Sequence, residues 1–509
     1  MHMKQLFLTL FLLPATLLGQ DLKKLDQYIE ESRKAWNVPG LAIAIVQDDE
    51  TALAKGYGVT DVETEEKVDE NTLFAIASNS KAFTSASLAI LVDDGKIEWD
   101  DKVTEYLPWF ELYDPFVTEQ MTVRDLLCHR TGLVTFSGDL IWYGTTHSRE
   151  EIVRRAKHLQ PHFGFREHFG YSNIMYLAAG LVVEEASGMS WDDFVKEHFF
   201  EPLGMDRTIT STNDLEGMEN VAMPHNDVDG KNIRIDYLNW DNVAPAGSMI
   251  SSVSDLTNWM KLQLNQGTLD GKEYFSKEQS VQMLAPHTID HGDDYGRGMR
   301  PGQHFNMYGL GWALMDYHGY KVVSHGGGYD GMISKTVLVP ELNLGFVILT
   351  NNINYMPSAL MYQILDAYIR PDEEVDYCGR YLQYKRASDR NKAEEFEARR
   401  QMRRADSKPS HDLKDYCGTY HSTIYGDIEI TPHKDPKKLN VQFVQTPLFK
   451  GELTHWHFDV FEIVLTEVPS LPPGSLQFYM DEDANITGLQ VDIPNPDFDF
   501  TEFEFKRQE

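Results

Sequence analysis

The stretch Ser78-Asn79-Ser80-Lys81 decides how the rest of this sequence is interpreted. It leads into a run of small and apolar residues without glycine or proline, from Ala82 to Val92, which is typical of a buried helix. Residues three apart on a helix share a face, so the hydroxyl of Ser78 is expected beside the amine of Lys81. The unpaired N–H groups and the positive dipole end of the helix start lie near the same serine. The stretch therefore predicts a nucleophile, a base and part of an oxyanion hole within one turn.

The simpler interpretation of these four residues is a helix-start serine followed by a solvated lysine. Ser-x-x-Lys specifies only two positions, so a chance match is unsurprising in a chain of 509 residues. A lysine that starts an apolar helix, however, needs a polar partner or a cavity. The burial pattern thus favours a site around Ser78 and Lys81.

The composition is that of a globular protein with more than one domain. At 509 residues the chain exceeds the size of an ordinary domain, and two or three domains are expected. Aromatic residues make up 12% of the chain, which argues against disorder. The chain has 79 Asp and Glu against 46 Lys and Arg, a formal charge of -33, which disfavours nucleic acid or anionic lipid as a partner. We expect a small-molecule or peptide substrate and leave the oligomeric state open.

The first residues have the pattern of a secretory signal peptide. Lys4 precedes a largely apolar stretch over residues 6–13, and the small Gly19 stands before a polar segment. This apolar run is too short to span a bilayer comfortably, and no longer one follows, so no membrane span is expected in the mature chain. We predict a signal peptide over residues 1–19 and a secreted or periplasmic protein.

The three cysteines, Cys128, Cys378 and Cys417, are too few for a disulfide framework. Cys378 and Cys417 stand in similar Asp-Tyr-Cys-Gly phrases and could pair. Free thiols are the favoured interpretation.

The order of apolar patterns predicts a first domain of mixed structure. Strand patterns occur near both of its ends, over residues 41–46, 51–59, 319–324, 333–339 and 344–350. Helical patterns occupy the middle, over residues 123–129, 174–187, 191–199 and 253–265. The sheet must therefore be assembled from strands that are far apart in sequence.

The composition changes near residue 370. Residues 386–407 are dense in charge and indicate an exposed helix or linker. From residue 413 onward, short strand patterns alternate with turns rich in Pro, Gly, Asp and Asn, which suggests a separate antiparallel barrel or sandwich. We predict a first domain over residues 20–370, a charged linker over 371–410 and a barrel domain over 411–509.

Two further clusters accompany the serine and the lysine. Tyr171-Ser172-Asn173 precedes an apolar helix, and His325-Gly326-Gly327-Gly328 ends a strand. With Ser78-x-x-Lys81, these clusters stand in the order and rough spacing of the class C β-lactamase and DD-peptidase superfamily of serine hydrolases, which the chain resembles over roughly residues 22–368. The resemblance implies an α+β fold, with an antiparallel sheet flanked by helices and a helical subdomain. The C-terminal part resembles the lipocalin-like barrel appended to some members of the family.

The resemblance implies roles for three side chains. Ser78 attacks a carbonyl to give an acyl-enzyme, and a serine hydroxyl needs a base to do so. Lys81 and Tyr171 serve as general bases, and either one can activate the serine. Burial lowers the pKa of a lysine. We expect the lysine charge to lower the pKa of the Tyr171 phenol from its ordinary value near 10, so that this residue can pass the proton to the leaving group.

The other motif residues are implied to bind the substrate. Asn173 hydrogen-bonds the substrate amide, and the backbone N–H groups of Ser78 and Gly328 form the oxyanion hole. Glycines such as Gly327 let the strand backbone approach the substrate closely. His325 stands where many β-lactamases and penicillin-binding proteins carry lysine. Since histidine is mostly neutral at pH 7, this weakens the case for substrates with a carboxylate at that point.

The sequence therefore predicts an exported serine hydrolase that cleaves an amide, peptide or ester, of the D-amino-acid peptidase, carboxypeptidase or esterase type. One alternative is a true β-lactamase or penicillin-binding protein, and another is a non-catalytic binding protein on the same scaffold. An α/β-hydrolase requires a Gly-x-Ser-x-Gly elbow after His325, and none follows. His455-x-His457 and the segment 291–294 raise the possibility of a metallohydrolase, but no His-Glu-x-x-His accompanies them, and we expect no metal or cofactor.

One aromatic stretch, residues 139–144, precedes the second cluster. Core packing is its favoured interpretation, and lining of the substrate pocket is the alternative.

Overall fold

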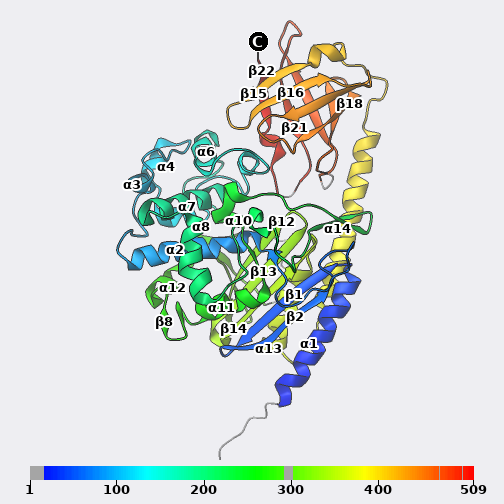
Figure 1. The fold of residues 1–509 in the computed structure, drawn as a ribbon. Helices are drawn as coiled ribbons and strands as arrows, with labels where there is room; N and C mark the ends of the chain where they lie inside the picture. The colour runs from blue at the N-terminus through cyan, green and yellow to red at the C-terminus, as the bar shows by residue number, and fades with distance from the viewer. Residues whose placement is uncertain (1–15, 292–301, 469–470, 496, 509) are drawn as a thin grey trace, which may run out of the picture.

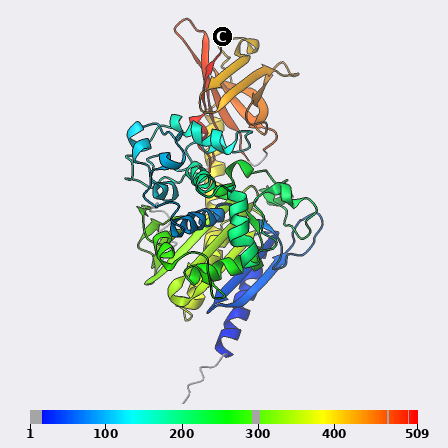
Figure 2. The ribbon, with the colours of Figure 1, turned by 60° about the vertical axis from the view of Figure 1, so that its left-hand side comes forward.

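The computed structural model describes residues 16–291, 302–468, 471–495 and 497–508. A larger α+β part carries a β-barrel at one end, and the long helix α14 (Tyr377–Gln401) runs between them (Figures 1 and 2). The predicted signal peptide over residues 1–19 falls mostly outside the described residues. None of the described helices is long and apolar enough to cross a membrane.

The larger part is built on one antiparallel sheet. Within the described residues its strand order is β2-β1-β14-β13-β12-β11-β10-β9. Strand β1 thus pairs with β14 from the end of the domain, so the sheet joins segments far apart in sequence, as predicted, and β2 pairs with β1. The strands are β1 (Gly40–Gln47), β2 (Glu50–Gly58), β9 (Thr288–Ile289), β10 (Asn306–Tyr308), β11 (Ala313–Tyr317), β12 (Tyr320–Tyr329), β13 (Met332–Val339) and β14 (Leu344–Thr350).

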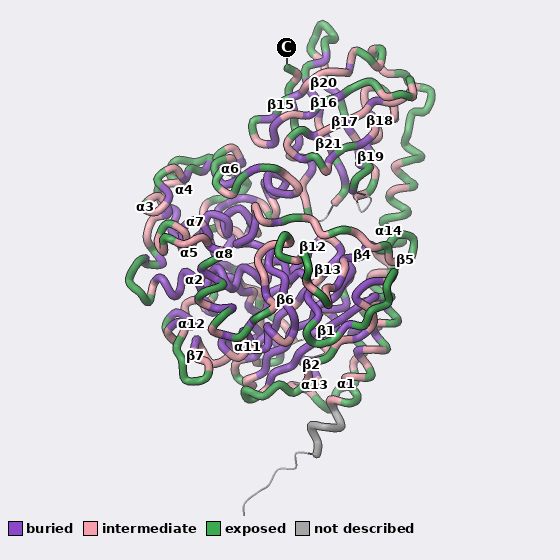
Figure 3. Tube along the Cα trace, in the orientation of Figure 1, coloured by how far each residue is buried: buried purple, intermediate pink, exposed green. Residues whose placement is uncertain are grey.

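Both faces of this sheet are covered, and β1 shows why. Its side chains alternate between two apolar clusters: Leu41, Ile43 and Ile45 lie in one, and Ala42 and Ala44 lie in the other. Successive residues of a strand point to opposite faces, so a continuous apolar strand is the pattern of a sheet buried on both sides. The buried interior on either side of the sheet is drawn in purple in Figure 3.

The helices cover the two faces and build a helical lobe. Helices α1 and α13 pack on one face, while α2 and α11 cover the other. The bounds are α1 (Thr16–Ala35), α2 (Ser80–Asp93), α3 (Val103–Tyr106), α4 (Pro115–Gln120), α5 (Val123–Leu127), α6 (Arg149–Arg155), α7 (Asn173–Ser187), α8 (Trp191–Val195), α9 (Glu201–Leu203), α10 (Ala244–Gly247), α11 (Val253–Leu264), α12 (Lys277–Met283) and α13 (Met356–Ile369).

The C-terminal part is a closed antiparallel barrel, eight-stranded within the described residues. Its strands are β15 (Gly418–Ser422), β16 (Gly426–Pro432), β17 (Lys438–Phe443), β18 (Lys450–His457), β19 (Val460–Leu465), β20 (Gly474–Met480), β21 (Ile486–Asp492) and β22 (Glu504–Arg507). A barrel of this size has an interior just wide enough for side chains to fill. Buried aromatic pairs fill it, such as Phe443 with Phe503 at 5.1 Å and Phe461 with Phe478 at 5.5 Å between ring centroids.

Helix α14 occupies most of the predicted charged linker. Its first turn is anchored, because Trp36 donates to the carbonyl of Cys378 at 3.1 Å and Tyr28 donates to Asp376 at 2.7 Å. Beyond its end, Arg403 donates to two carbonyls of β18. Cys378 and Cys417 are both free thiols, as expected.

Candidate active site

Ser78 lies on a one-turn 3₁₀ helix, Ala77–Asn79, that leads into α2. The sequence predicts the serine at the start of the helix itself, and the structure places it one tight turn earlier. The preceding strand β3 (Phe74–Ala75) pairs with β6 (Ile250–Ser251) and fixes this entry. Ala77 has a positive φ of 46°, a strained conformation for a residue with a β-carbon. The chain is thus held in an unusual shape directly before Ser78.

Lys81 is fully buried and points at Ser78. Its Nζ lies 3.0 Å from Ser78 Oγ, 2.7 Å from Asn173 Oδ1 and 2.7 Å from the carbonyl oxygen of Ala246 on α10. As an ammonium ion the lysine donates to all three atoms. As a neutral amine it donates its two N–H bonds to the two carbonyl oxygens, and its lone pair faces the Ser78 hydroxyl. The second state is the one that can accept the serine proton.

The environment of Lys81 favours that neutral amine. Burial lowers the pKa of Lys81 well below its ordinary value, and the nearby carboxyl group of Asp139 opposes the shift in part. The predicted lysine base is therefore supported by burial and by three polar contacts.

Tyr171 and Asn173 flank the start of α7. Ser172 caps this helix by accepting from the backbone of Met175, which directs its two neighbours toward Lys81. The Lys81 amine lies 4.8 Å from the centre of the Tyr171 ring. Asn173 donates from Nδ2 to Asp139 Oδ2 at 2.6 Å while its carbonyl oxygen accepts from Lys81. Asn173 thus links a buried carboxyl group to the lysine.

The pKa of Tyr171 moves in the direction opposite to our expectation. Burial raises the pKa of the phenol, the charge of Asp139 adds to the rise, and a hydrogen bond with Ser78 opposes it. The lysine charge was expected to lower this value, but burial disfavours both the phenolate and the ammonium ion. In the resting site, Tyr171 is therefore a neutral proton donor.

His325 lies on β12 beside the same residues and is neutral. Its Nε2 lies 2.8 Å from the Tyr308 hydroxyl, and its Nδ1 lies 2.6 Å from the carbonyl oxygen of Gly326. Burial, with the Lys81 charge, lowers the pKa of His325 to about 3. A neutral imidazole cannot attract a carboxylate as a charged lysine does, which agrees with the sequence-based expectation.

The predicted residues meet at one cavity of about 420 Å³, which is lined by Ser78, Tyr171, Asn173, His325 and Gly328 among others. Lys81 lies behind its wall. Gly327 packs against the segment that precedes the serine.

Sequence reasoning missed three contributors to the site. Asp139 supports Asn173, and Ala246 supplies a carbonyl to Lys81. Phe498 comes from the barrel and lines the same cavity as Ser78. Trp142 and Tyr143 in the aromatic stretch are both buried and part of the lining, so core packing and pocket lining both apply to them. Asp139 begins the aromatic stretch noted in the sequence, whereas nothing near Phe498 signals its role.

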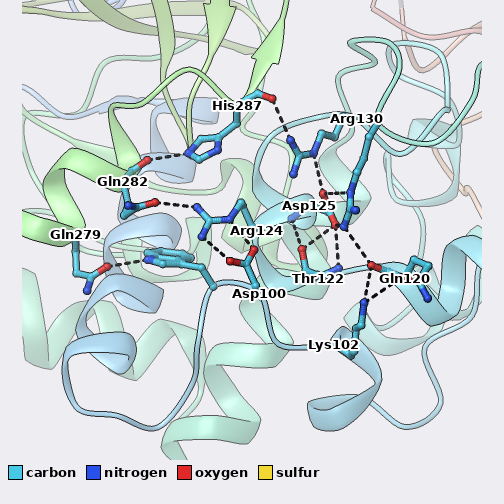
Figure 4. Close-up of polar contacts among 12 residues, drawn as sticks. Asp100, Lys102, Gln120, Thr122, Arg124, Asp125, Arg130, Gln279, Gln282 and His287 are labelled. Atoms are coloured by element: carbon cyan, nitrogen blue, oxygen red, sulfur yellow. Dashed lines mark hydrogen bonds and ion pairs between the residues drawn. The ribbon is translucent and has the colours of Figure 1, made fainter.

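A polar network in the helical lobe surrounds Asp125 and Arg130 (Figure 4). The buried carboxylate of Asp125 on α5 accepts from Arg130 at 2.7 Å and also pairs with Arg166. Arg130 in turn donates to the carbonyl of His287 at 3.0 Å. His129, next to Arg130 in the sequence, accepts from the backbone N–H of Ser172 at 3.1 Å. This bond holds the helix start that carries Tyr171 and Asn173.

The residues considered as metal ligands lie only partly within the described structure. Among the described residues, no group of three His, Cys, Asp or Glu side chains is placed to hold a metal ion. His455 lies at a bulge of β18 and bonds to the carbonyl of Phe458. Residues 292–294 lie outside the described part of the chain.

A serine and a tyrosine line one cavity of an α+β fold, and a buried lysine lies 3.0 Å from the serine hydroxyl. The model of the family described as Beta-lactamase matches residues 25–363. The chain belongs to this family. A second model, a domain of unknown function (DUF3471), matches residues 402–507, which include all strands of the barrel.

The chain is also similar in sequence to several known proteins. The chain is 28% identical over 361 residues to the unguisins hydrolase ungD of Aspergillus violaceofuscus, covering 67% of this chain and 64% of that protein. It is 29% identical over 379 residues to the unguisins hydrolase ungD' of Aspergillus campestris, covering 69% and 66%. Protein flp of Staphylococcus aureus strain MW2 is 28% identical over 340 residues, covering 66% and 64%. The chain thus spans slightly less than two thirds of the length of these relatives.

Solved structures share the fold. The octameric penicillin-binding protein homologue from Pyrococcus abyssi superposes with a TM-score of 0.63 at 21% identity, covering 96% of this chain and 100% of that one. A crystal structure of SurE superposes with a TM-score of 0.55 at 20% identity, covering 96% and 99%.

Proposed function

We propose that this protein cleaves an amide, peptide or ester bond through an acyl-enzyme on Ser78, with Lys81 as the base. The observation that carries the proposal is the 3.0 Å contact between Lys81 Nζ and Ser78 Oγ inside a buried site that favours the neutral amine. The family membership and the hydrolase names of the relatives support it.

The proposed reaction follows from the protonation states. Lys81 takes the proton of Ser78 as Oγ bonds to the substrate carbonyl carbon, and N–H groups of Ser78 and Gly328 stabilise the oxyanion. The bond to the leaving group then breaks, and Tyr171, which is neutral, gives that group its proton. The phenolate is reprotonated from Lys81. Water then attacks the acyl-enzyme by the same route and releases the acid.

The neutral state of His325 affects which substrates the site is expected to accept. A substrate whose recognition depends on a carboxylate beside the scissile bond gains no charge partner from this residue. We therefore favour peptidase or esterase activity on substrates without that carboxylate over a true β-lactamase or penicillin-binding protein. We disfavour a non-catalytic binding role, because Lys81 Nζ contacts Ser78 Oγ at 3.0 Å and Ser78 lines the cavity.

Three further assignments belong to the proposal. We propose export to the periplasm or the exterior, on the pattern of residues 1–19. We keep the domain division of 20–370, 371–410 and 411–509, and we propose a lipocalin-like architecture for the closed antiparallel barrel. Asn173 and His325 are proposed to contact the substrate, since both line the cavity.

The test is covalent labelling with a fluorophosphonate probe followed by peptide mapping. We expect the label on Ser78 in the wild type and no label in Ser78→Ala. An unlabelled wild type, or a labelled Ser78→Ala protein, would overturn the proposed function.

A further inference from the structure

The connection between β21 and β22 brings the barrel to the active-site cavity through its described residues 493–495 and 497–503 (Figures 1 and 2). A second barrel segment, residues 445–449, contacts the neighbouring aromatic stretch, where Phe449 lies 6.0 Å from Tyr143 between ring centroids. Phe498 in this connection packs on Tyr143, with 4.4 Å between the ring centroids, and both rings line the cavity. The barrel interior is filled by aromatic side chains. Any contribution of the barrel to catalysis must therefore come from its outer connections.

The carboxylate of Glu502 in this connection forms hydrogen bonds to the loop of residues 137–139 beside the active site. Its Oε1 accepts from the Ser137 hydroxyl at 2.6 Å, and its Oε2 accepts from the backbone N–H of Gly138 at 2.9 Å. Inside the barrel part, Tyr425 donates to the same Oε2. Both carboxylate oxygens are thus engaged by donors, which fixes the direction of the group and the loop that it holds.

The loop held by Glu502 carries Asp139. Gly138 precedes it in a left-handed conformation with φ of 76°. A β-carbon at residue 138 would lie 2.4 Å from the side chain of Leu159 and 3.0 Å from that of Ile174 on α7. The backbone at residue 138 is therefore packed tightly against both side chains. Asp139 then accepts from Asn173, and Asn173 accepts from Lys81. An unbroken chain of hydrogen bonds and backbone runs from Glu502 to the amine beside Ser78.

We propose that Glu502 is a positioning residue of the active site, by which the barrel holds the 137–139 loop and so aims Asn173 and Lys81 at Ser78. This inference rests on the proposed acyl-enzyme function and extends it to the C-terminal domain. The barrel then contributes to catalysis by positioning active-site residues. A misplacement of about 1 Å in an active site can lower the rate roughly 100-fold. Loss of the hydrogen bonds that hold the loop before Asp139 should therefore lower the reaction rate measurably.

The charge of Glu502 gives a second, independent readout. Burial raises the pKa of Asp139 to about 7, hydrogen bonds with Trp142 and Asn173 and the charge of Lys81 oppose the rise, and the charge of Glu502 adds to it. Asp139 faces Lys81, Glu502, Tyr171 and Tyr425. Lys81 also faces His129 and His325. Without the charge at 502, Asp139 ionises at lower pH and keeps the Lys81 amine protonated to higher pH.

The experiment compares the second-order rate constant of fluorophosphonate labelling across pH in the full chain. For Glu502→Gln we expect a roughly 10- to 100-fold slower reaction and an acid limb moved to higher pH. Glu502→Asp keeps the charge and should hold the acid limb at its wild-type position, even where the shorter side chain slows the reaction. Ser137→Ala should slow labelling less and should not add to Glu502→Gln, because the two groups share one contact.

Arg155→Gln is the matched control. Arg155 also ties the barrel to the helical lobe, through the carbonyls of Thr423 and Ile424, but does not touch the 137–139 loop. We expect wild-type labelling from this variant. Equal loss in both variants would mean that barrel docking in general, and not Glu502, is required, and would overturn the inference. Wild-type labelling in Glu502→Gln would overturn it as well. A wild type without label would instead defeat the proposed function.

Discussion

Gly327 packs so closely against Ile76 that a β-carbon at residue 327 would lie 2.2 Å from the Ile76 carbonyl oxygen. Ile76 stands two residues before Ser78, so this contact seats the strand with the His-Gly-Gly motif directly against the segment that presents the nucleophile. Glycine is required there by the close approach of two backbones.

The first prediction follows from that contact. Gly327→Ala should reduce labelling of Ser78 by roughly 100-fold or more, because the added carbon pushes the segment before the serine out of place. The matched control is Gly326→Ala, where a β-carbon would meet atoms no closer than 3.8 Å and should be tolerated. Near-equal labelling rates for the two variants would show that the close approach does not position the nucleophile.

The second prediction concerns stability and pH. His325 has a pKa of about 3 in the folded protein, against an ordinary value of 6.5. The unfolded chain therefore binds more protons between these values, so His325 contributes stability above pH 6.5 and loses it as pH falls toward 3. The difference in the free energy of unfolding between wild type and His325→Gln should change by up to a few kcal/mol between pH 4 and 7, as urea titrations can measure. A constant difference across this range would show that His325 titrates normally.

The third prediction concerns the substrate. His325→Lys should gain activity toward substrates with a carboxylate beside the scissile bond, relative to neutral ones, since an ammonium group replaces a neutral ring. A panel of p-nitrophenyl esters, D- and L-amino-acid amides, muropeptides and nitrocefin measures this preference in both proteins. An unchanged ranking in a folded variant would refute a role for His325 in carboxylate selection.

The fourth prediction concerns the barrel wall of the cavity. Phe498→Ala should enlarge the cavity and raise kcat/KM for bulky acyl groups relative to small ones. Phe458→Ala is the control, because Phe458 belongs to the same barrel but is 58% exposed and does not line the cavity. If Phe498→Ala leaves the size preference of the enzyme unchanged, the barrel does not limit its substrates.

The sequence predicts the local parts of this site well. The spacing of Ser78 and Lys81 fixes their shared face, and Ser172 before an apolar run fixes the helix start that carries Tyr171 and Asn173. A sheet that joins strands from both ends of the domain is also predictable, because helical patterns fill the middle, whereas the particular pairing of β1 with β14 is not.

The remaining parts depend on contacts between distant segments. The hydrogen bond from Asn173 to Asp139 joins residues 34 apart, and the one from Ser137 to Glu502 joins residues 365 apart. No periodicity encodes such contacts. The predicted direction of the Tyr171 pKa shift is wrong for a related reason. The pKa depends on how deeply the fold buries the phenol as well as on the nearby lysine.

The central claim is that a neutral Lys81 activates Ser78, and the most direct measurement is the rate of fluorophosphonate labelling of Ser78 in wild type and Lys81→Met at neutral pH. Methionine retains most of the apolar stem but has no basic lone pair. We predict a rate roughly 10²- to 10⁴-fold lower in the variant, with the fold intact by circular dichroism. Labelling of Ser78 at the wild-type rate in Lys81→Met would contradict this account.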